Sequence, residues 1–282
     1  DQVEAGEDGL FAAGALSVTL LDAADQPILE PAPGETPLWD AVRVTALFSG
    51  EQDLTPTLKA APADLATGMP SAPEPVADRE WTRVWEDQFH PLQMGERLWI
   101  CPSWTPPPDP DAVNILLDPG LAFGTGTHPT TAMCLRALDA GMRPGMRVVD
   151  YGCGSGILGV AAARLGAVAV LAVDNDPQAI TASRDNAARN QVSDTCLCAV
   201  LSGDVEIEAW AESAEWVVAN ILAGPLVSLA STLTALIAPG GQLLLAGLLA
   251  DQADEVIEAY APAVRLKVTD QHEEWVLLAG AR

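Results

Sequence analysis

The chain has 282 residues and a formal net charge of −25, with 14 lysines and arginines against 39 aspartates and glutamates. Phosphate contacts need clustered basic side chains, so this composition argues against a direct grip on nucleic acid. No apolar run approaches the roughly 20 residues of a membrane-spanning helix, and no signal peptide opens the chain. These features predict a cytoplasmic protein without a membrane anchor.

The cysteines and histidines do not indicate a metal. The five cysteines lack the paired spacing of a zinc site or a disulfide framework, and the three histidines are scattered. We therefore expect reduced thiols and no metal site. The acidity has two interpretations: it attracts and steers a basic protein substrate, or it maintains solubility in a salty cytoplasm.

Residues 1–66 predict a small α+β domain. Helical patterning over 4–13 is followed by strand-like alternation over 15–21 and 39–48, with a weakly specified helix over 53–66. Val42, Val44 and Ala46 should share one face of the second strand. Residues 67–95 should be a linker, because 67–77 are rich in proline and small residues. Within it, Trp81, Val84, Trp85 and Phe89 would line one face of a short helix.

After a strand at 98–101, strand-like and helix-like segments alternate from residue 113 onward. Strands are expected at 98–101, 147–150, 168–173, 215–219 and 241–247, and helices at 129–140, 156–165, 177–190 and 224–237. Such alternation predicts a parallel sheet with helices on both faces. Segments 264–268 and 275–279, joined by a polar link, predict a terminal hairpin and an antiparallel last strand.

A glycine turn follows one of these strands. The run ends at Asp150, and glycines follow at Gly152, Gly154 and Gly156 before an alanine-rich helix. Glycine lets the main chain approach a ligand closely, and a helix N-terminus offers unpaired N–H groups. The dinucleotide fingerprint would need glycine where Ile157 stands, which weakens an NAD or FAD interpretation. The turn alone is also a structural need of many βα units.

Polar residues follow two further strands. Asp174 lies 22 residues after Gly152, where a Rossmann-like unit places the acid that binds ribose hydroxyls. Asn220 ends the strand at 215–219, and ligands of open α/β sheets collect at the carboxyl edge. Before the sheet, loop 117–131 carries glycines, hydroxyls and a helix start near Pro129. It suits folding over a polar ligand, although its residues also make an ordinary turn and N-cap.

Four of these motifs, in this order, resemble those of class I S-adenosylmethionine (SAM) methyltransferases. More closely, they resemble the bacterial ribosomal protein L-eleven methyltransferase family (PrmA type). The four are 117–131, 150–156, 173–180 and 219–226, and the similarity continues over 33–36, 85–91 and 95–99. The resemblance therefore covers nearly the whole chain.

This resemblance implies an α/β architecture: a Rossmann-like class I methyltransferase sheet over 96–282, mostly parallel with an antiparallel C-terminal strand. It also implies a ferredoxin-like substrate-recognition domain over 1–66 on the linker 67–95. Residue 1 would fall within the first helix of that domain, so we expect its first strand to be missing. The family methylates lysine side chains and the N-terminal α-amine of one ribosomal protein, with S-adenosylhomocysteine as the product.

The residues implied by the resemblance are carried over by position. Cofactor-binding positions are Thr131, Gly152, Asp174 and Asn220, with Phe123, Gly124, Thr125 and Gly126 in the loop over the cofactor and Asp150 and Gly154 in the turn. Asn220 is also the expected catalytic residue, since its side-chain oxygen or the adjacent backbone carbonyls could accept from the substrate amine and orient it. The alternative for Asn220 is a strand-end cap. His128 could take a proton or only hydrogen-bond within the loop.

The reaction requires little acid or base catalysis from the protein. Methyl transfer from a sulfonium to an amine is an in-line displacement, so the site mainly positions and desolvates the reactants. The amine must arrive neutral, although a free lysine has a pKa of about 10.4. A low-dielectric site beside a cationic sulfonium would lower that pKa.

Two other functions stay open. One is a related methyltransferase acting on a glutamine amide or on RNA. Glutamine-directed relatives carry Asn-Pro-Pro-Tyr where this chain has Asn220-Ile-Leu-Ala, and the acidic surface opposes RNA. The other is a SAM-binding factor without catalysis, against which the presence of both Asp174 and Asn220 argues. The expected partner is the ribosomal protein, free or on the ribosome, and the expected state is a monomer.

Overall fold

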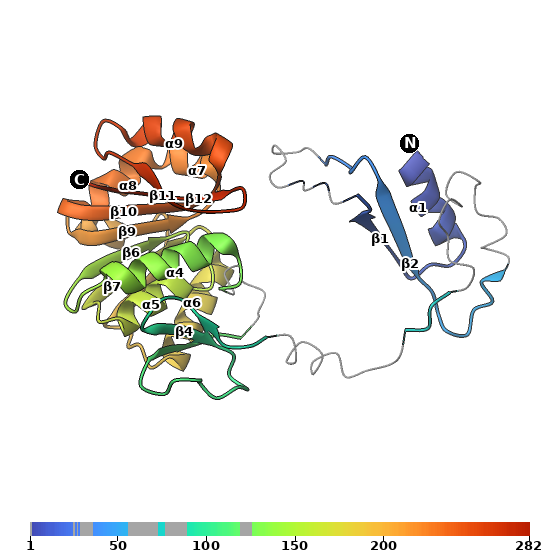
Figure 1. Cartoon of the computed structure of the whole chain (residues 1–282), viewed down its shortest axis with the longest axis horizontal. Coiled ribbons are helices and arrows are strands. Elements are labelled where there is room, and N and C mark those ends of the chain that lie inside the picture. The colour runs from blue at the N-terminus through green and yellow to red at the C-terminus, as the bar shows by residue number, and fades with distance from the viewer. Residues whose placement is uncertain are drawn as a thin grey trace. The chain divides into compact units, whose positions relative to one another are not determined.

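The computed structural model describes residues 2–24, 26, 28, 36–55, 73–76, 89–118 and 126–282. Contacts within the chain divide it into two units, Asp1–Glu80 and Trp81–Arg282, which are described separately (Figure 1). Most of the expected helix at 53–66 and nearly all of the expected aromatic helix at 81–89 lie outside the described residues.

The described residues of the N-terminal unit form one helix and a two-stranded ribbon. Helix α1 (Gln2–Ala12) precedes β1 (Ser17–Asp22) and β2 (Val42–Leu47), which pair antiparallel from Ser17 opposite Leu47 to Asp22 opposite Val42. Exposure alternates along both strands, and Val42, Val44 and Ala46 lie on the less exposed face of β2, as the sequence alternation predicts. The helix lies beside the ribbon (Figure 1).

The C-terminal unit is built on a seven-stranded sheet in the order β11-β12-β10-β9-β6-β7-β8. Its strands are β6 (Arg147–Tyr151), β7 (Ala169–Asp174), β8 (Leu197–Leu201), β9 (Ala214–Asn220), β10 (Ile237–Leu249), β11 (Lys267–His272) and β12 (Trp275–Ala281). Five adjacent strands, β10, β9, β6, β7 and β8, run parallel to one another. Strand β12 is antiparallel to β10, and β11 is antiparallel to β12. This confirms the predicted mostly parallel sheet with an antiparallel C-terminal end.

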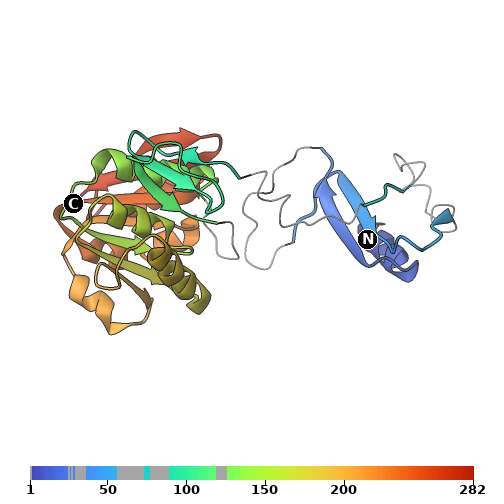
Figure 2. The same ribbon diagram turned by 90° about the horizontal axis from the view of Figure 1, so that it is seen from below.

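Both faces of the sheet are buried under helices (Figures 1 and 2). Helices α4 (Pro129–Gly141), α5 (Ile157–Arg164) and α6 (Pro177–Arg189) share one apolar cluster with the sheet, and α7 (Ala223–Ser228), α8 (Ala230–Leu236) and α9 (Ala253–Tyr260) share the other. Successive strand residues alternate between the clusters, because side chains along a strand point to opposite faces: Val148 belongs to the first and Val149 to the second. Double burial accounts for the nearly continuous apolar runs of these strands.

A small three-stranded sheet accompanies the large one. Strand β3 (Leu92–Gln93) pairs antiparallel with β4 (Leu98–Cys101), which pairs in parallel with β5 (Val113–Leu116). The described residues of this unit also include two short 3-10 helices, η1 (Val205–Trp210) and η2 (Ala250–Gln252). Across the described parts of the chain, no helix is both long and apolar enough to cross a membrane.

Several expectations need correction. The single helix expected at 224–237 is two helices, α7 and α8, which meet at Leu229. The strand expected at 264–268 begins only at Lys267, and β11 continues to His272, so most of the expected polar link is strand. The reason is that β11 is an exposed edge strand, which needs no apolar alternation. Strands β5 and β8 and helix α9 were not predicted.

Candidate active site

The glycine turn after β6 has a backbone that favours residues without side chains. Gly152, Gly154 and Gly156 have φ angles of 78°, 52° and 75°, in the left-handed region where a Cβ is disfavoured. The N–H of Gly152 donates to the carbonyl of Val173 over 2.7 Å, which ties the turn to the neighbouring strand β7. A Cβ on Gly152 would also lie 2.2 Å from Cγ2 of Ile221. Close packing and backbone conformation therefore both require glycine there.

Asp174 lies beside this turn, as its position at the end of β7 predicts. Its Oδ2 accepts from the N–H of Gly154 over 2.9 Å, and its Oδ1 accepts from the N–H of Asp176 over 3.0 Å. Asp176 then caps α6, because its Oδ1 accepts from the N–H of Gln178 over 2.8 Å. These bonds fix the carboxylate at the carboxyl edge of the sheet, next to the glycine turn.

Asp150 is buried beneath the turn, only 1% exposed. Its Oδ2 accepts from the N–H of Gly159 over 2.8 Å, whereas its buried Oδ1 has no hydrogen-bond partner among the described residues. Burial raises the pKa of Asp150 to about 7; the bond from Gly159 opposes this and the charge of Asp174 adds to it. This carboxyl is placed to support the turn from within the core.

Asn220 ends β9 at the same edge, and its partner comes from a distant helix. Its Nδ2 donates over 3.1 Å to Oγ1 of Thr131, a fully buried residue in the first turn of α4. In the described chain, the buried Oδ1 of Asn220 accepts no hydrogen bond. A buried acceptor without a donor is costly, so this oxygen is the candidate hydrogen-bond acceptor at this edge of the sheet.

His128 is the N-cap of α4. Its Nδ1 accepts from the N–H of Thr130 over 3.4 Å and lies 2.8 Å from Oγ1 of the same residue. Its ring packs edge-on against Trp275, with centroids 4.9 Å apart. Burial lowers the pKa of His128, so the neutral, capping form is favoured. This geometry agrees with hydrogen bonding within the loop.

Loop 117–131 is described only in part. Phe123, Gly124 and Thr125 lie outside the described residues. Gly126 has φ 83°, and a Cβ there would lie 3.3 Å from Cδ1 of Ile157, so the end of the loop packs against the start of α5. The structure thus brings Gly126, the glycine turn, Asp174 and the Thr131–Asn220 pair to one region.

Sequence reasoning missed several residues that support the glycine turn and the end of β9. Ile221 packs on Gly152, Gly247 packs on Ile221, and Ser183 and Asn186 bind carbonyls of the glycine turn. Polar residues three apart on one helix face were the only available signal for the last two. Within the described ranges, no cluster of three or more metal-ligating side chains occurs.

Comparisons with known proteins decide which family this site belongs to. A family model described as ribosomal protein L11 methyltransferase (PrmA) matches residues 1–282. This chain belongs to the ribosomal protein L11 methyltransferase family. Relatives of that name are 51% identical in Pseudomonas paraeruginosa, over all of this chain and 95% of theirs, and 48% identical in Cellvibrio japonicus, over 99% and 94%. The resemblance found in the sequence is thereby confirmed.

A solved member of the ribosomal protein L11 methyltransferase family supports the fold assignment. A ribosomal protein L11 methylase from Lactobacillus delbrueckii subsp. bulgaricus is 32% identical, with a TM-score of 0.60, covering 69% of this chain and 99% of that one. The chain is a class I methyltransferase, and its methyl donor is SAM.

The residues of this L11-family methyltransferase fit that cofactor. Side chains at Gly152 and Gly156 would clash, a carboxylate fixed by hydrogen bonds lies at the end of β7, and the buried Oδ1 of Asn220 has no partner among the described residues. A backbone turn next to a carboxylate at the carboxyl edge of a parallel sheet is the arrangement at which α/β folds bind such ligands. Bound SAM would supply the electrophilic methyl group.

Proposed function

We propose that this chain transfers methyl groups from SAM to amines of ribosomal protein L11, both lysine side chains and the N-terminal α-amine. The observation that carries the proposal is an acceptor at the sheet edge. The Nδ2 of Asn220 donates a hydrogen bond to Thr131, and among the described residues no donor binds the buried Oδ1 of Asn220. A neutral amine has N–H groups to donate to that oxygen while its lone pair faces the methyl group. Asn220 would therefore orient the nucleophile.

The amide at 220 also suits the protonation state that the reaction needs. A carboxylate there would stabilise the ammonium form and raise the pKa of the amine, whereas a neutral amide accepts a hydrogen bond without attracting a cation. Asp150, buried beneath the glycine turn, is held towards its neutral form by burial, which raises its pKa to about 7. Both features favour an uncharged substrate amine.

The cofactor assignments follow the family positions. We assign the ribose hydroxyls to Asp174, and the aminocarboxypropyl arm to the turn around Gly152 and Gly154 with Asp150 beneath it. Thr131 and Asn220 complete the site from α4 and β9. Phe123, Gly124, Thr125 and Gly126 would cover the cofactor.

The domain organisation is part of the proposal. Residues 1–66 would be the ferredoxin-like recognition domain, 67–95 the linker and 96–282 the methyltransferase domain. The division of contacts near residue 80 supports a module separate from the catalytic fold. We propose a cytoplasmic monomer that meets L11 free or on the ribosome. The net charge of −25 supports recognition through protein rather than nucleic acid.

The test is methylation of purified L11 with methyl-labelled SAM, followed by mapping of the label by mass spectrometry. We expect methylated lysine and N-terminal amines with the natural enzyme and loss of the label with Asn220→Ala. Thr131→Val, which removes the partner of Nδ2, should reduce the rate without abolishing it. Calorimetry with S-adenosylhomocysteine run in parallel separates loss of chemistry from loss of cofactor binding.

Other outcomes of the same experiment would overturn the proposal. Label on glutamine amides, or on ribosomal RNA when whole subunits replace L11, would assign a different acceptor. Tight cofactor binding without transfer to L11 or to subunits would indicate a binding factor.

A further inference from the structure

Three polar side chains form a stripe along α6: Ser183, Asn186 and Asn190. Their spacing of three and four residues places them on one helix face. Ser183 is fully buried and Asn190 is 3% exposed. Polar groups in such places are unfavourable unless they are hydrogen-bonded, so their bonds indicate what this helix face holds.

The first two side chains hold the glycine turn. Oγ of Ser183 donates to the carbonyl of Gly154 over 3.1 Å, and Nδ2 of Asn186 donates to the carbonyl of Ser155 over 2.8 Å. A Cβ on Gly156 would lie 2.9 Å from Cα of Ser183. Helix α6 therefore packs directly on the turn and binds two of its carbonyls.

Asn190, at the end of α6, holds a different segment. Its Oδ1 accepts from the N–H of Leu116 over 2.7 Å, and its Nδ2 donates over 2.8 Å to the carbonyl of Leu116 and over 2.9 Å to that of Asn186. The amide thus pairs with both backbone groups of Leu116, as a neighbouring strand would. Leu116 is the last residue of β5.

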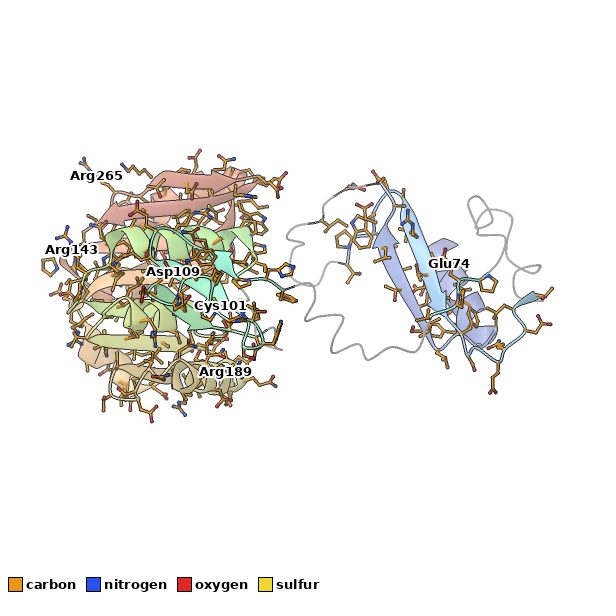
Figure 3. All side chains as sticks on the ribbon, turned by 60° about the horizontal axis from the view of Figure 1, so that its bottom comes forward. Glu74, Cys101, Asp109, Arg143, Arg189 and Arg265 are labelled. Atoms are coloured by element: carbon orange, nitrogen blue, oxygen red, sulfur yellow. The ribbon has the colours of Figure 1, made fainter. Side chains whose placement is uncertain are left out.

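An ion pair and further hydrogen bonds stabilise the contact between the end of α6 and the end of β5. Arg189, labelled in Figure 3, forms a 2.7 Å ion pair with Asp118, two residues beyond β5, and Asp118 also accepts from Oγ of Ser103. From the other side, the guanidinium of Arg164 on α5 donates to the carbonyl of Asn190 over 3.0 Å. One helix therefore connects the glycine turn, the C-terminus of α5 and the end of β5.

We propose that Asn190 is a positioning residue for SAM, acting with Asn186 through α6. Asn190 pairs with Leu116 while Asn186 binds Ser155, so the two side chains hold the end of β5 at a fixed position relative to the glycine turn. Neither asparagine is among the residues assigned to the cofactor. The inference concerns cofactor affinity, so it is tested without reference to which amine is methylated.

The experiment compares Asn190→Leu, which removes the amide at nearly constant size, with the natural enzyme. We expect the Kd for S-adenosylhomocysteine by calorimetry and the KM for SAM to rise about tenfold, which corresponds to the loss of about one hydrogen bond between the displaced turn and the cofactor. The kcat at saturating SAM and the KM for L11 should stay within about twofold.

Two further variants keep the test decisive. Asn186→Ala should fold readily, because alanine favours helix, and should weaken cofactor binding about threefold to fivefold. Tyr260→Phe is the matched control, because it removes a buried 2.8 Å bond to the carbonyl of Leu226 in the other apolar cluster. It should lower Tm without changing cofactor affinity. Natural affinity in folded Asn190→Leu and Asn186→Ala, with only Tm lowered, would overturn the proposal.

Discussion

The buried carboxyl of Asp150 should make the stability of this protein depend on pH. Its pKa is raised by burial to about 7, above the value of about 3.9 expected in the unfolded chain. Between these values the native state binds more protons than the unfolded state, so this group's contribution to stability falls as pH rises and levels off above about 7. The sign is opposite to that of a carboxylate in a salt bridge.

Asp150→Asn tests this dependence, because the amide keeps an acceptor for the N–H of Gly159 but does not ionise. We expect the free energy of unfolding of the variant, relative to the natural protein, to increase by about 2 to 3 kcal/mol between pH 5 and pH 8. Urea unfolding of the two proteins at a series of pH values measures the difference, in which all other groups cancel. A difference that is constant with pH would show that Asp150 is ionised in the folded protein.

Asn220→Asp should change the pH dependence of catalysis. The carboxylate would attract the ammonium form of the substrate and raise the pKa of the bound amine by about 1 unit or more. More alkaline solution would then be needed to produce the neutral nucleophile. We expect log kcat of the variant, measured at saturating L11, to be reduced at pH 7.5 and to recover partly towards pH 9. A profile lowered equally at every pH would contradict the proposed contact between residue 220 and the amine.

Strand β10 contains an irregularity that makes room for the end of β9. Its pairing with β12 shifts register between Leu245 and Leu248, and Gly247 lies within this bulge with φ 87°. A Cβ on Gly247 would lie 2.5 Å from the carbonyl oxygen of Ile221, the residue after Asn220. Because the obstacle is backbone, it cannot rotate away. Bulges often lie beside active sites, where they redirect a neighbouring segment.

Gly247→Ala should therefore disturb both stability and the site. Gly145→Ala is its control, because Gly145 has φ 91° and no described atom lies within 4 Å of its Cβ position. The control should cost about 1 kcal/mol from backbone strain alone. We expect Gly247→Ala to cost about 2 kcal/mol more and to reduce kcat, measured by urea unfolding and methyl transfer. Equal losses in the two variants would show that Ile221 moves freely.

The elements that the sequence predicts best are those with a strong local signal. Double burial gives β6, β7 and β9 continuous apolar runs, and their carboxyl ends place Asp150, Asp174 and Asn220 at one edge without further information. Strand β11 was placed wrongly because an exposed edge strand carries polar residues, and the break at Leu229 between α7 and α8 follows no proline or glycine signal.

Side-chain hydrogen bonds between residues far apart in the sequence could not be predicted. The bond between Asn220 and Thr131 joins residues 89 apart, and that between Asn190 and Leu116 joins residues 74 apart. Each depends on how α4 and α6 pack on the sheet, which periodicity does not specify. Glycine positions were evident in the sequence, but the reason for Gly247 lies in the backbone of Ile221, just after strand β9.

At the scale of the whole molecule, acidity is the dominant property. Acidic residues outnumber basic ones in both units, so the charge is not confined to one surface. Like charges on one chain repel each other. At physiological ionic strength, salt largely screens this repulsion between exposed charges more than about 8 Å apart. We therefore expect the free energy of unfolding to rise as sodium chloride is added, measured by thermal or urea unfolding. A fall with salt would mean that attractive pairs outweigh the net repulsion.

The same charge gives a separate prediction for catalysis. If acidity steers a basic protein substrate, kcat/KM for L11 should fall as ionic strength increases, because screening slows charged encounter more than it affects chemistry. A loss of about tenfold between 20 and 300 mM salt is within the range of electrostatic steering. Both kcat and the SAM KM, measured in the same titration, should change much less, since the methyl donor is small and its site is fixed by hydrogen bonds. A kcat/KM that is flat with salt, alongside rising stability, would instead assign the acidity to solubility in a salty cytoplasm.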